Sequence, residues 1–122
     1  MQSEPTGQMS NAACNLVAAL ERLDGDADLL SMLITVYQED SVELLTQLNV
    51  AIGERNTLSA ERAAHSLKGL ASNFDGFRSV EAALIIETAA RQGDWSAIDA
   101  GLPRLEQEVS LLRQALVDHQ QR

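Results

Sequence analysis

The sequence has few of the features that stabilise secreted proteins or hold a chain in a membrane. Its one cysteine, Cys14, allows no internal disulfide and no thiolate metal cluster, and fits a reducing compartment. No run approaches the roughly 20 apolar residues of a membrane span, and residues 1–10 lack the apolar stretch of a secretory signal. We therefore expect a soluble, cytoplasmic protein in which Cys14 is a small residue of a helix.

Positive charge and aromatic residues are also scarce. The chain has 9 Lys and Arg residues against 18 Asp and Glu residues, a net charge of −9. Repulsion between this charge and phosphate groups argues against nucleic acid and against an anionic membrane surface as partners. Aromatic residues make up 3% of a chain that is 45% hydrophobic, so the core must consist mainly of Leu, Ala, Val and Ile.

Apolar residues recur at helical spacing along most of the 122 residues, and no segment shows the alternation of a strand. This length suits one domain. We predict a flexible lead-in over residues 1–10, a helical domain over residues 11–118 and a polar tail over residues 119–122. The fold class is all-α, an antiparallel up-down-up-down four-helix bundle with an additional N-terminal helix. The helices are predicted at residues 11–23, 26–52, 57–74, 78–92 and 102–117.

Pro103 interrupts the last helical pattern. Proline is tolerated in the first turn of a helix but breaks its interior. We therefore predict a short helical piece over residues 95–100, a break near Gly101 and a separate final helix.

The functional prediction depends on residues 63–74. At about 100° per residue, the alanines, leucines and phenylalanine of this stretch form one apolar stripe, and His65 lies opposite it. Glu61 and Lys68 flank His65 on one side, and Gly69 flanks it on the other. A glycine inside a helix costs roughly 1 kcal/mol relative to alanine, which indicates that something approaches the backbone beside His65. The alternative is an ordinary solvated face that carries one histidine.

The turn at residues 75–76 predicts that the next helix returns antiparallel, with Glu87 level with His65 and Arg91 one turn further on. A carboxylate that binds one nitrogen of a neutral imidazole leaves the other nitrogen free as a nucleophile. With Lys68 and Arg91 to stabilise negative charge, this set suits a phosphoryl acceptor. Alternatively, Glu87 is a solvated residue that pairs with Arg91 at i,i+4 spacing, and the spacing does not decide between the two.

The sequence lacks the parts that an enzyme needs to cleave a nucleotide by itself. It contains no glycine-rich phosphate loop, no carboxylate cluster for Mg²⁺ and no Ser-His-Asp set with plausible spacing. The second histidine, His119, lies in the predicted tail, so we expect no metal site built from two histidines. The phosphoryl donor and acceptor must then be other proteins.

Residues 64–69 (AHSLKG), followed by residues 71–73 (ASN), resemble the signature of histidine-containing phosphotransfer (HPt) domains of multistep two-component phosphorelays. The similarity extends over residues 14–117. It implies that His65 accepts a phosphoryl group from the aspartate of one receiver domain and passes it to another. It further implies a phosphocarrier without independent turnover, no cofactor of its own, and Mg²⁺ supplied by the receiver.

The resemblance also assigns expected roles to the residues around the histidine. Lys68 matches the cation that the family places near the phosphoryl group, and Gly69 matches the small residue that lets the receiver approach. Glu87 matches a Gln or Glu that hydrogen-bonds the histidine, and Arg91 matches a second cation in some members. Glu61 and Ser72, on the same helix face, are expected to contribute to binding. The implied partners are response-regulator receiver domains and a histidine kinase. We expect the protein to be a monomer.

Two other functions remain open at this stage. The first is a helical adaptor that docks a receiver or kinase without accepting phosphate, and the second is an enzyme with its own turnover, such as a phosphatase. Leu16, Leu70 and Phe77 are considered as an apolar docking patch beside His65, although Leu70 equally suits the core.

Overall fold

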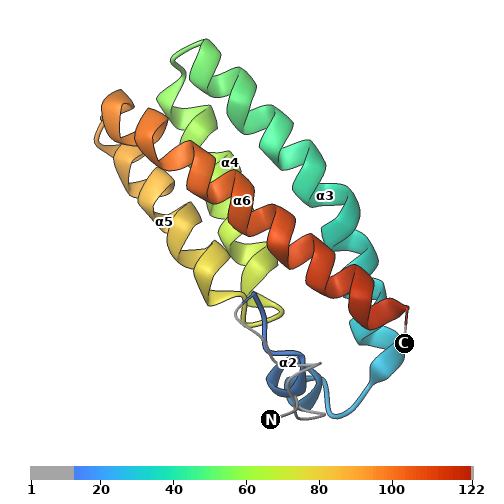
Figure 1. Cartoon of the computed structure of the whole chain (residues 1–122). Coiled ribbons are helices and arrows are strands. Elements are labelled where there is room, and N and C mark those ends of the chain that lie inside the picture. Colours follow the sequence, from blue (N-terminus) through green and yellow to red (C-terminus); the bar gives the residue numbers. More distant parts are fainter. Residues whose placement is uncertain (1–12, 122) are drawn as a thin grey trace, which may run out of the picture.

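The computed structural model of the chain describes residues 13–121, and five α-helices make up most of this part (Figure 1). α3 to α6 form a bundle in which α4 packs against α3 and α5, and α6 packs against α5 and α3. α2 contacts α3 and lies at one end of the bundle. The predicted fold class, an antiparallel four-helix bundle with an additional N-terminal helix, is confirmed. The helices are α2 (Leu16–Arg22), α3 (Ala27–Gly53), α4 (Thr57–Ser72), α5 (Phe77–Arg91) and α6 (Trp95–Gln120).

Four of these helices begin with the same local interaction. A side-chain oxygen of the residue before the helix accepts a hydrogen bond from a backbone N–H three positions later, which satisfies one of the unpaired N–H groups of the first turn. Each cap fixes the residue at which its helix begins, so the connections between consecutive helices stay short. The caps are Asn15, Asp26, Asn56 and Asp94.

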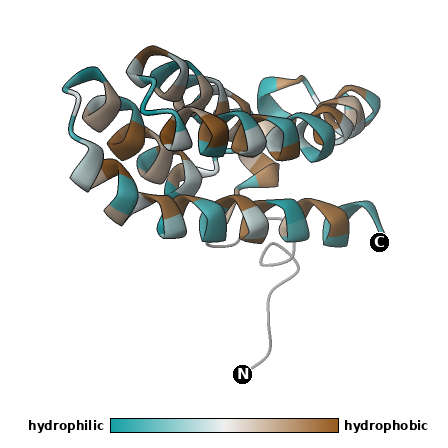
Figure 2. Ribbon diagram, turned by 90° about the horizontal axis from the view of Figure 1, so that it is seen from above, coloured by the Kyte–Doolittle hydropathy of each residue, from teal (hydrophilic) through white to brown (hydrophobic). Residues whose placement is uncertain are grey.

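Small and aliphatic side chains fill the interior, as the composition requires, and hydrophobic and hydrophilic residues alternate along each helix (Figure 2). The two largest fully buried side chains, Tyr37 and Phe74, meet edge to face with their ring centres 5.7 Å apart. The buried residues of α4 and α5 are mostly alanines, whose small size allows helices to approach closely. This is the helix pair that carries the candidate site. Its buried alanines are Ala60, Ala63, Ala64 and Ala71 on α4 and Ala82, Ala83, Ala89 and Ala90 on α5.

The start of the chain differs from the prediction. Residues 1–12, which include the predicted lead-in and the first residues of the predicted helix, lie outside the described part. The described helix begins only at Leu16, and Cys14 is a buried residue before it rather than a residue of the helix. The N–H of Asn15 donates to the carbonyl oxygen of Phe74 at 2.8 Å, so this segment docks on the α4–α5 turn instead of continuing the helix.

The predicted break at Pro103 is wrong, because α6 runs without interruption from Trp95 to Gln120. Pro103 lies on the exposed face, and so does Asp99, whose carbonyl group loses its hydrogen-bond donor at the proline and can bind water instead. Ile98 before the proline and Leu105 after it are fully buried, so packing holds both segments in one helix.

Two predicted helix ends also differ from the structure. α4 ends at Ser72, and Phe74 is buried in the following turn rather than in the helix. At the end of the chain, α6 includes His119 and Gln120, which the prediction placed in a tail.

Candidate functional site

His65 lies in the middle of α4, and 66% of its side-chain surface is exposed. The opposite face of the same helix is buried, with Ala64 and Leu67 at 0% and 2% exposure. The predicted orientation, with the ring held out of the core by an amphipathic helix, is therefore confirmed.

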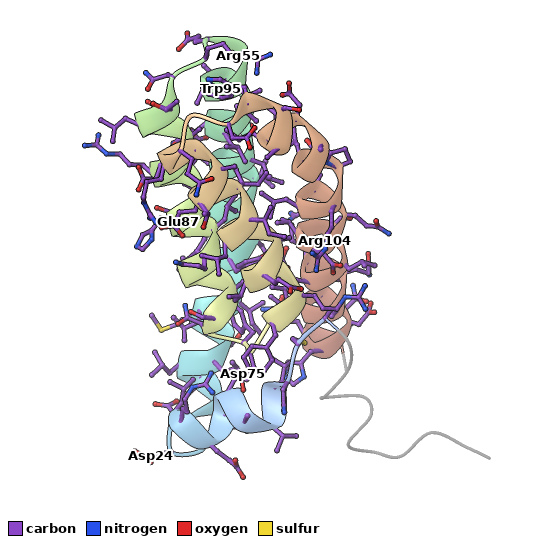
Figure 3. The ribbon with its side chains drawn as sticks, turned by 90° about the vertical axis from the view of Figure 1, so that its left-hand side faces the viewer. Asp24, Arg55, Asp75, Glu87, Trp95 and Arg104 are labelled. Atoms are coloured by element: carbon purple, nitrogen blue, oxygen red, sulfur yellow. The ribbon has the colours of Figure 1, made fainter. Side chains whose placement is uncertain are left out.

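Glu87 faces His65 from α5. Its Oε2 atom lies 2.8 Å from Nδ1 of the imidazole, and only 4% of the glutamate side chain is exposed. Figure 3 labels Glu87 among the side chains of the bundle. The register follows from the α4–α5 turn, which brings residue 87 level with residue 65 as the sequence predicts. The alternative of a solvated Glu87 is excluded by its burial, although its pairing with Arg91 is also present, with Arg91 Nη2 donating to Oε2 at 3.2 Å.

The ionisation of Glu87 fixes which nitrogen of the imidazole donates to it. Burial by itself raises the pKa of a carboxyl group, but hydrogen bonds from Lys68 and His65 and the positive charge of Lys68 outweigh burial and hold the pKa of Glu87 below its usual value. An ionised carboxylate only accepts hydrogen bonds, so Nδ1 carries the proton and donates it to Glu87. The lone pair of the neutral ring is then on Nε2, which has no hydrogen-bond partner among residues 13–121.

Two cations surround the same carboxylate. Nζ of Lys68 lies 2.7 Å from Oε1 of Glu87, with the lysine side chain 27% exposed. Arg91 binds Glu87 through Nη2 and, through Nε, donates to Oε2 of Glu61 at 3.0 Å. The structure thus brings together His65, Lys68, Glu87, Arg91 and Glu61.

Gly69 and Ser72 are placed differently from these five residues. A Cβ atom added to Gly69 would meet nothing within 4 Å, so the packing of the chain itself does not require glycine there. The hydroxyl of Ser72 donates to the carbonyl of Gly69 at 2.7 Å. Ser72 lies about 10 Å beyond His65 along the helix, so it does not contact the histidine.

The apolar patch considered from the sequence does not form beside the histidine. Leu16 is buried and Leu70 is half-buried. Phe77 is 68% exposed, but it begins α5 and lies about 15 Å along that helix from the level of Glu87.

Sequence reasoning missed the part that α3 plays beside the site. A surface hollow of about 550 Å³ lies between α3 and the Gly69 side of α4. The sequence offered no signal for it, because spacing alone does not say which face of a helix of 27 residues lies beside α4. The hollow is lined by Asp40, Glu43, Leu44 and Gln47 of α3, by Ser66, Gly69 and Leu70 of α4, and by Asn73.

The described residues, 13–121, contain neither a metal-binding cluster nor a membrane-spanning helix. No group of three or more His, Cys, Asp or Glu side chains in this part is arranged to hold a metal ion. None of the described helices combines the length and apolar character needed to cross a membrane.

The fold and the site define a class of protein, a helical bundle that presents one outward histidine backed by a buried carboxylate. The Hpt domain family matches residues 32–115, which is more than half of the chain, and the chain belongs to this family. Its role is therefore histidine phosphotransfer in a two-component phosphorelay.

A solved structure supports the fold. The chain is similar to histidine-containing phosphotransfer protein B (HptB) from Pseudomonas aeruginosa PAO1, with a TM-score of 0.84 and 22% sequence identity over 92% of this chain and 97% of that chain. Comparison with curated proteins gives no match.

Proposed function

We propose that His65 is the residue that carries the phosphoryl group, taking it from the phosphoaspartate of one receiver domain and giving it to the aspartate of another. The observation that supports this most is the 2.8 Å contact between Nδ1 of His65 and Glu87 on an imidazole that is otherwise exposed. It combines an accessible nucleophile with a partner that orients the ring and fixes its tautomer.

The transfer step follows from this arrangement. Nε2 attacks the phosphorus of the receiver's acyl phosphate, and an N–P bond forms while the P–O bond to the aspartate breaks and its electron pair leaves with the carboxylate. The proton on Nδ1 stays, so the ring becomes a phosphorylated imidazolium whose positive charge faces Glu87. In the onward step an aspartate oxygen attacks the phosphorus, and the N–P electron pair returns to the ring.

Lys68 is proposed to stabilise the phosphoryl oxygens. Its ammonium group is held by Glu87, which also binds the histidine, and its partial exposure leaves it free to turn toward an incoming anion. A cation close to the transferring group lowers the cost of the charge that builds up on its oxygens.

The remaining functions belong to the partner. Open space at Gly69 leaves room for a receiver to approach the backbone of α4. We propose that the receiver supplies Mg²⁺ and much of the catalysis, and that this domain binds no cofactor and has no independent turnover. We also propose that it works as a monomer with receiver domains and a histidine kinase. The proposed compartment is the cytoplasm, because the single cysteine suits a reducing environment.

The test is to incubate the protein with a ³²P-phosphorylated receiver domain. We expect label that resists base and is lost in acid, and we expect none on the His65→Gln variant, which should stay folded because the ring is largely exposed. The matched control is His119→Gln, the only other histidine, which should keep full labelling.

Each other outcome has a defined meaning. Label that persists in His65→Gln would refute the site. Receiver binding without any labelling of the wild type would instead favour the adaptor. Continuous phosphate release by the isolated protein would favour a phosphatase.

A further inference from the structure

Arg91 does not stand free beside His65 but bridges two carboxylates. Its Nε donates to Oε2 of Glu61 at 3.0 Å, and its Nη2 donates to Oε2 of Glu87 at 3.2 Å. Glu61 precedes His65 by one turn on the same face of α4, and 28% of its side chain is exposed. The position of the Arg91 guanidinium therefore depends on Glu61, which forms no hydrogen bond with His65.

This bridge changes the charge that an incoming phosphoryl group meets. Lys68 and Arg91 are each paired with a carboxylate, so the two positive charges around His65 are balanced by the two negative charges of Glu61 and Glu87. A phosphoryl group on Nε2 adds negative charge next to this neutral set, and Arg91 must leave Glu61 before both arms of its fork can bind phosphoryl oxygens.

We propose that Glu61 is a positioning residue that holds Arg91 back from the phosphoryl group and so keeps phosphorylated His65 only weakly stabilised. This inference rests on the proposed role of His65. A carrier must release what it accepts, and a guanidinium clamp on the phosphoryl group would favour retention. Arg91 and His65 bind the same oxygen of Glu87, so the guanidinium lies beside the ring, and release by Glu61 would free this long side chain to turn toward the phosphoryl oxygens.

The experiment compares four proteins: wild type, Glu61→Gln, Arg91→Gln and the double variant. Each is loaded with phosphoramidate, mixed with Mg²⁺ and a purified receiver domain that exchanges phosphate with the wild type, and followed to equilibrium on gels that separate phosphorylated forms. The rate of hydrolysis of phosphohistidine without the receiver is a second measurement. Thermal unfolding checks that all four proteins are folded.

We expect Glu61→Gln to shift the equilibrium toward phosphorylated His65 by about two- to fivefold, the size of an exposed ion pair, and to slow hydrolysis. In the Arg91→Gln background, the same change at Glu61 should have no further effect, because Glu61 acts through Arg91. The matched control is Glu81→Gln, which removes the same charge and an exposed ion pair with Arg104 of 2.9 Å on another side of α5, and should leave the equilibrium unchanged.

An unchanged equilibrium in Glu61→Gln would overturn the inference. A Glu61→Gln shift of equal size in the wild-type and Arg91→Gln backgrounds would also overturn it, because Glu61 would then act by direct repulsion of the phosphoryl group and not through Arg91. These results leave the proposed function intact, because the protein is still labelled on His65. The proposed function would be refuted by a different result, namely labelling that persists when His65 is replaced. That result would also refute the inference, which depends on phosphorylated His65.

Discussion

Two buried carboxylates of the bundle are alike in their surroundings and differ in what they can do. The side chains of Glu87 on α5 and Glu108 on α6 are each 4% exposed, and each is held by cations. Nε of Arg78 donates to both oxygens of Glu108, at 3.2 and 3.1 Å, and Arg104 lies 4.0 Å away. Figure 3 shows Arg104 on the opposite side of the molecule from Glu87.

The difference lies in the third partner. The side-chain partners of Glu108 are arginines, which have no lone pair to offer and stay protonated, so that cluster can only join helices. Glu87 also accepts a hydrogen bond from Nδ1 of His65, an exposed ring whose second nitrogen carries a lone pair. In both places a buried carboxylate paired with cations joins neighbouring helices. Only at Glu87 does an exposed imidazole add a nucleophile, so only Glu87 belongs to a candidate functional site.

The largest expected effect is on the rate of phosphoryl uptake, which replacement of Glu87 should lower and replacement of Glu108 should not. Glu87→Ala removes the acceptor for Nδ1–H, and we expect phosphoryl uptake from a receiver to slow by about 10- to 100-fold, as for other partners that orient a functional histidine. Glu108→Ala should change uptake by less than about twofold, since it has no contact with His65, and rapid-quench kinetics measure both. Glu87→Gln should lose less than Glu87→Ala, because an amide oxygen can still accept from Nδ1.

The comparison between the carboxylates would fail if Glu108→Ala slowed uptake as much as Glu87→Ala. Unfolding curves for both variants separate a specific loss of rate from a general loss of folded protein.

Much of the fold was predictable because it depends on local patterns. The stripe opposite His65 and the caps at Asp26 and Asp94 follow from helical periodicity and from side chains that can bind free N–H groups. The break at Pro103 was predicted wrongly, since the local cost of a proline was outweighed by packing of Ile98 and Leu105 that no local pattern reveals.

The part of the site that could be predicted is the part that lies on α4 and α5, the two helices joined by one short turn. Glu87 could be placed opposite His65 because a short turn fixes the register of two antiparallel helices. The bridge from Arg91 to Glu61 and the hollow beside Gly69 were not, because they depend on side-chain direction and on the face that α3 turns toward α4. The burial of Glu87, which Lys68 and His65 outweigh to keep it ionised, likewise appears only in three dimensions.

A second comparison, between two glycines, should give effects of opposite sign on stability. A Cβ at Gly76, in the α4–α5 turn, would meet Leu112 Cδ2 at 3.0 Å and the carbonyl oxygen of Ala71 at 3.1 Å, so Gly76→Ala should destabilise by about 1–3 kcal/mol. Gly69→Ala meets nothing of the chain and should stabilise α4 by about 0.5–1 kcal/mol. Urea unfolding measures both free energies.

The same Gly69→Ala protein tests whether the open space serves a partner. We expect it to accept phosphate from a receiver more slowly than the wild type despite its greater stability. Unchanged transfer in a stabilised Gly69→Ala variant would mean that the glycine has no part in docking.

The smallest effect concerns acid and depends on the lowered pKa of Glu87. Because the pKa of Glu87 in the folded protein lies below its ordinary value of 4.5, the unfolded chain takes up the proton first as the pH falls. The stabilising contribution of the ionised carboxylate is therefore complete above pH 4.5 and is lost as the pH falls through the folded-state pKa. Glu87→Gln cannot titrate, so its deficit in unfolding free energy relative to the wild type should shrink as the pH falls below 4.5. Urea unfolding of both proteins over a pH series measures this difference, and a deficit that grew toward low pH would show that burial, rather than Lys68 and His65, dominates the environment of Glu87.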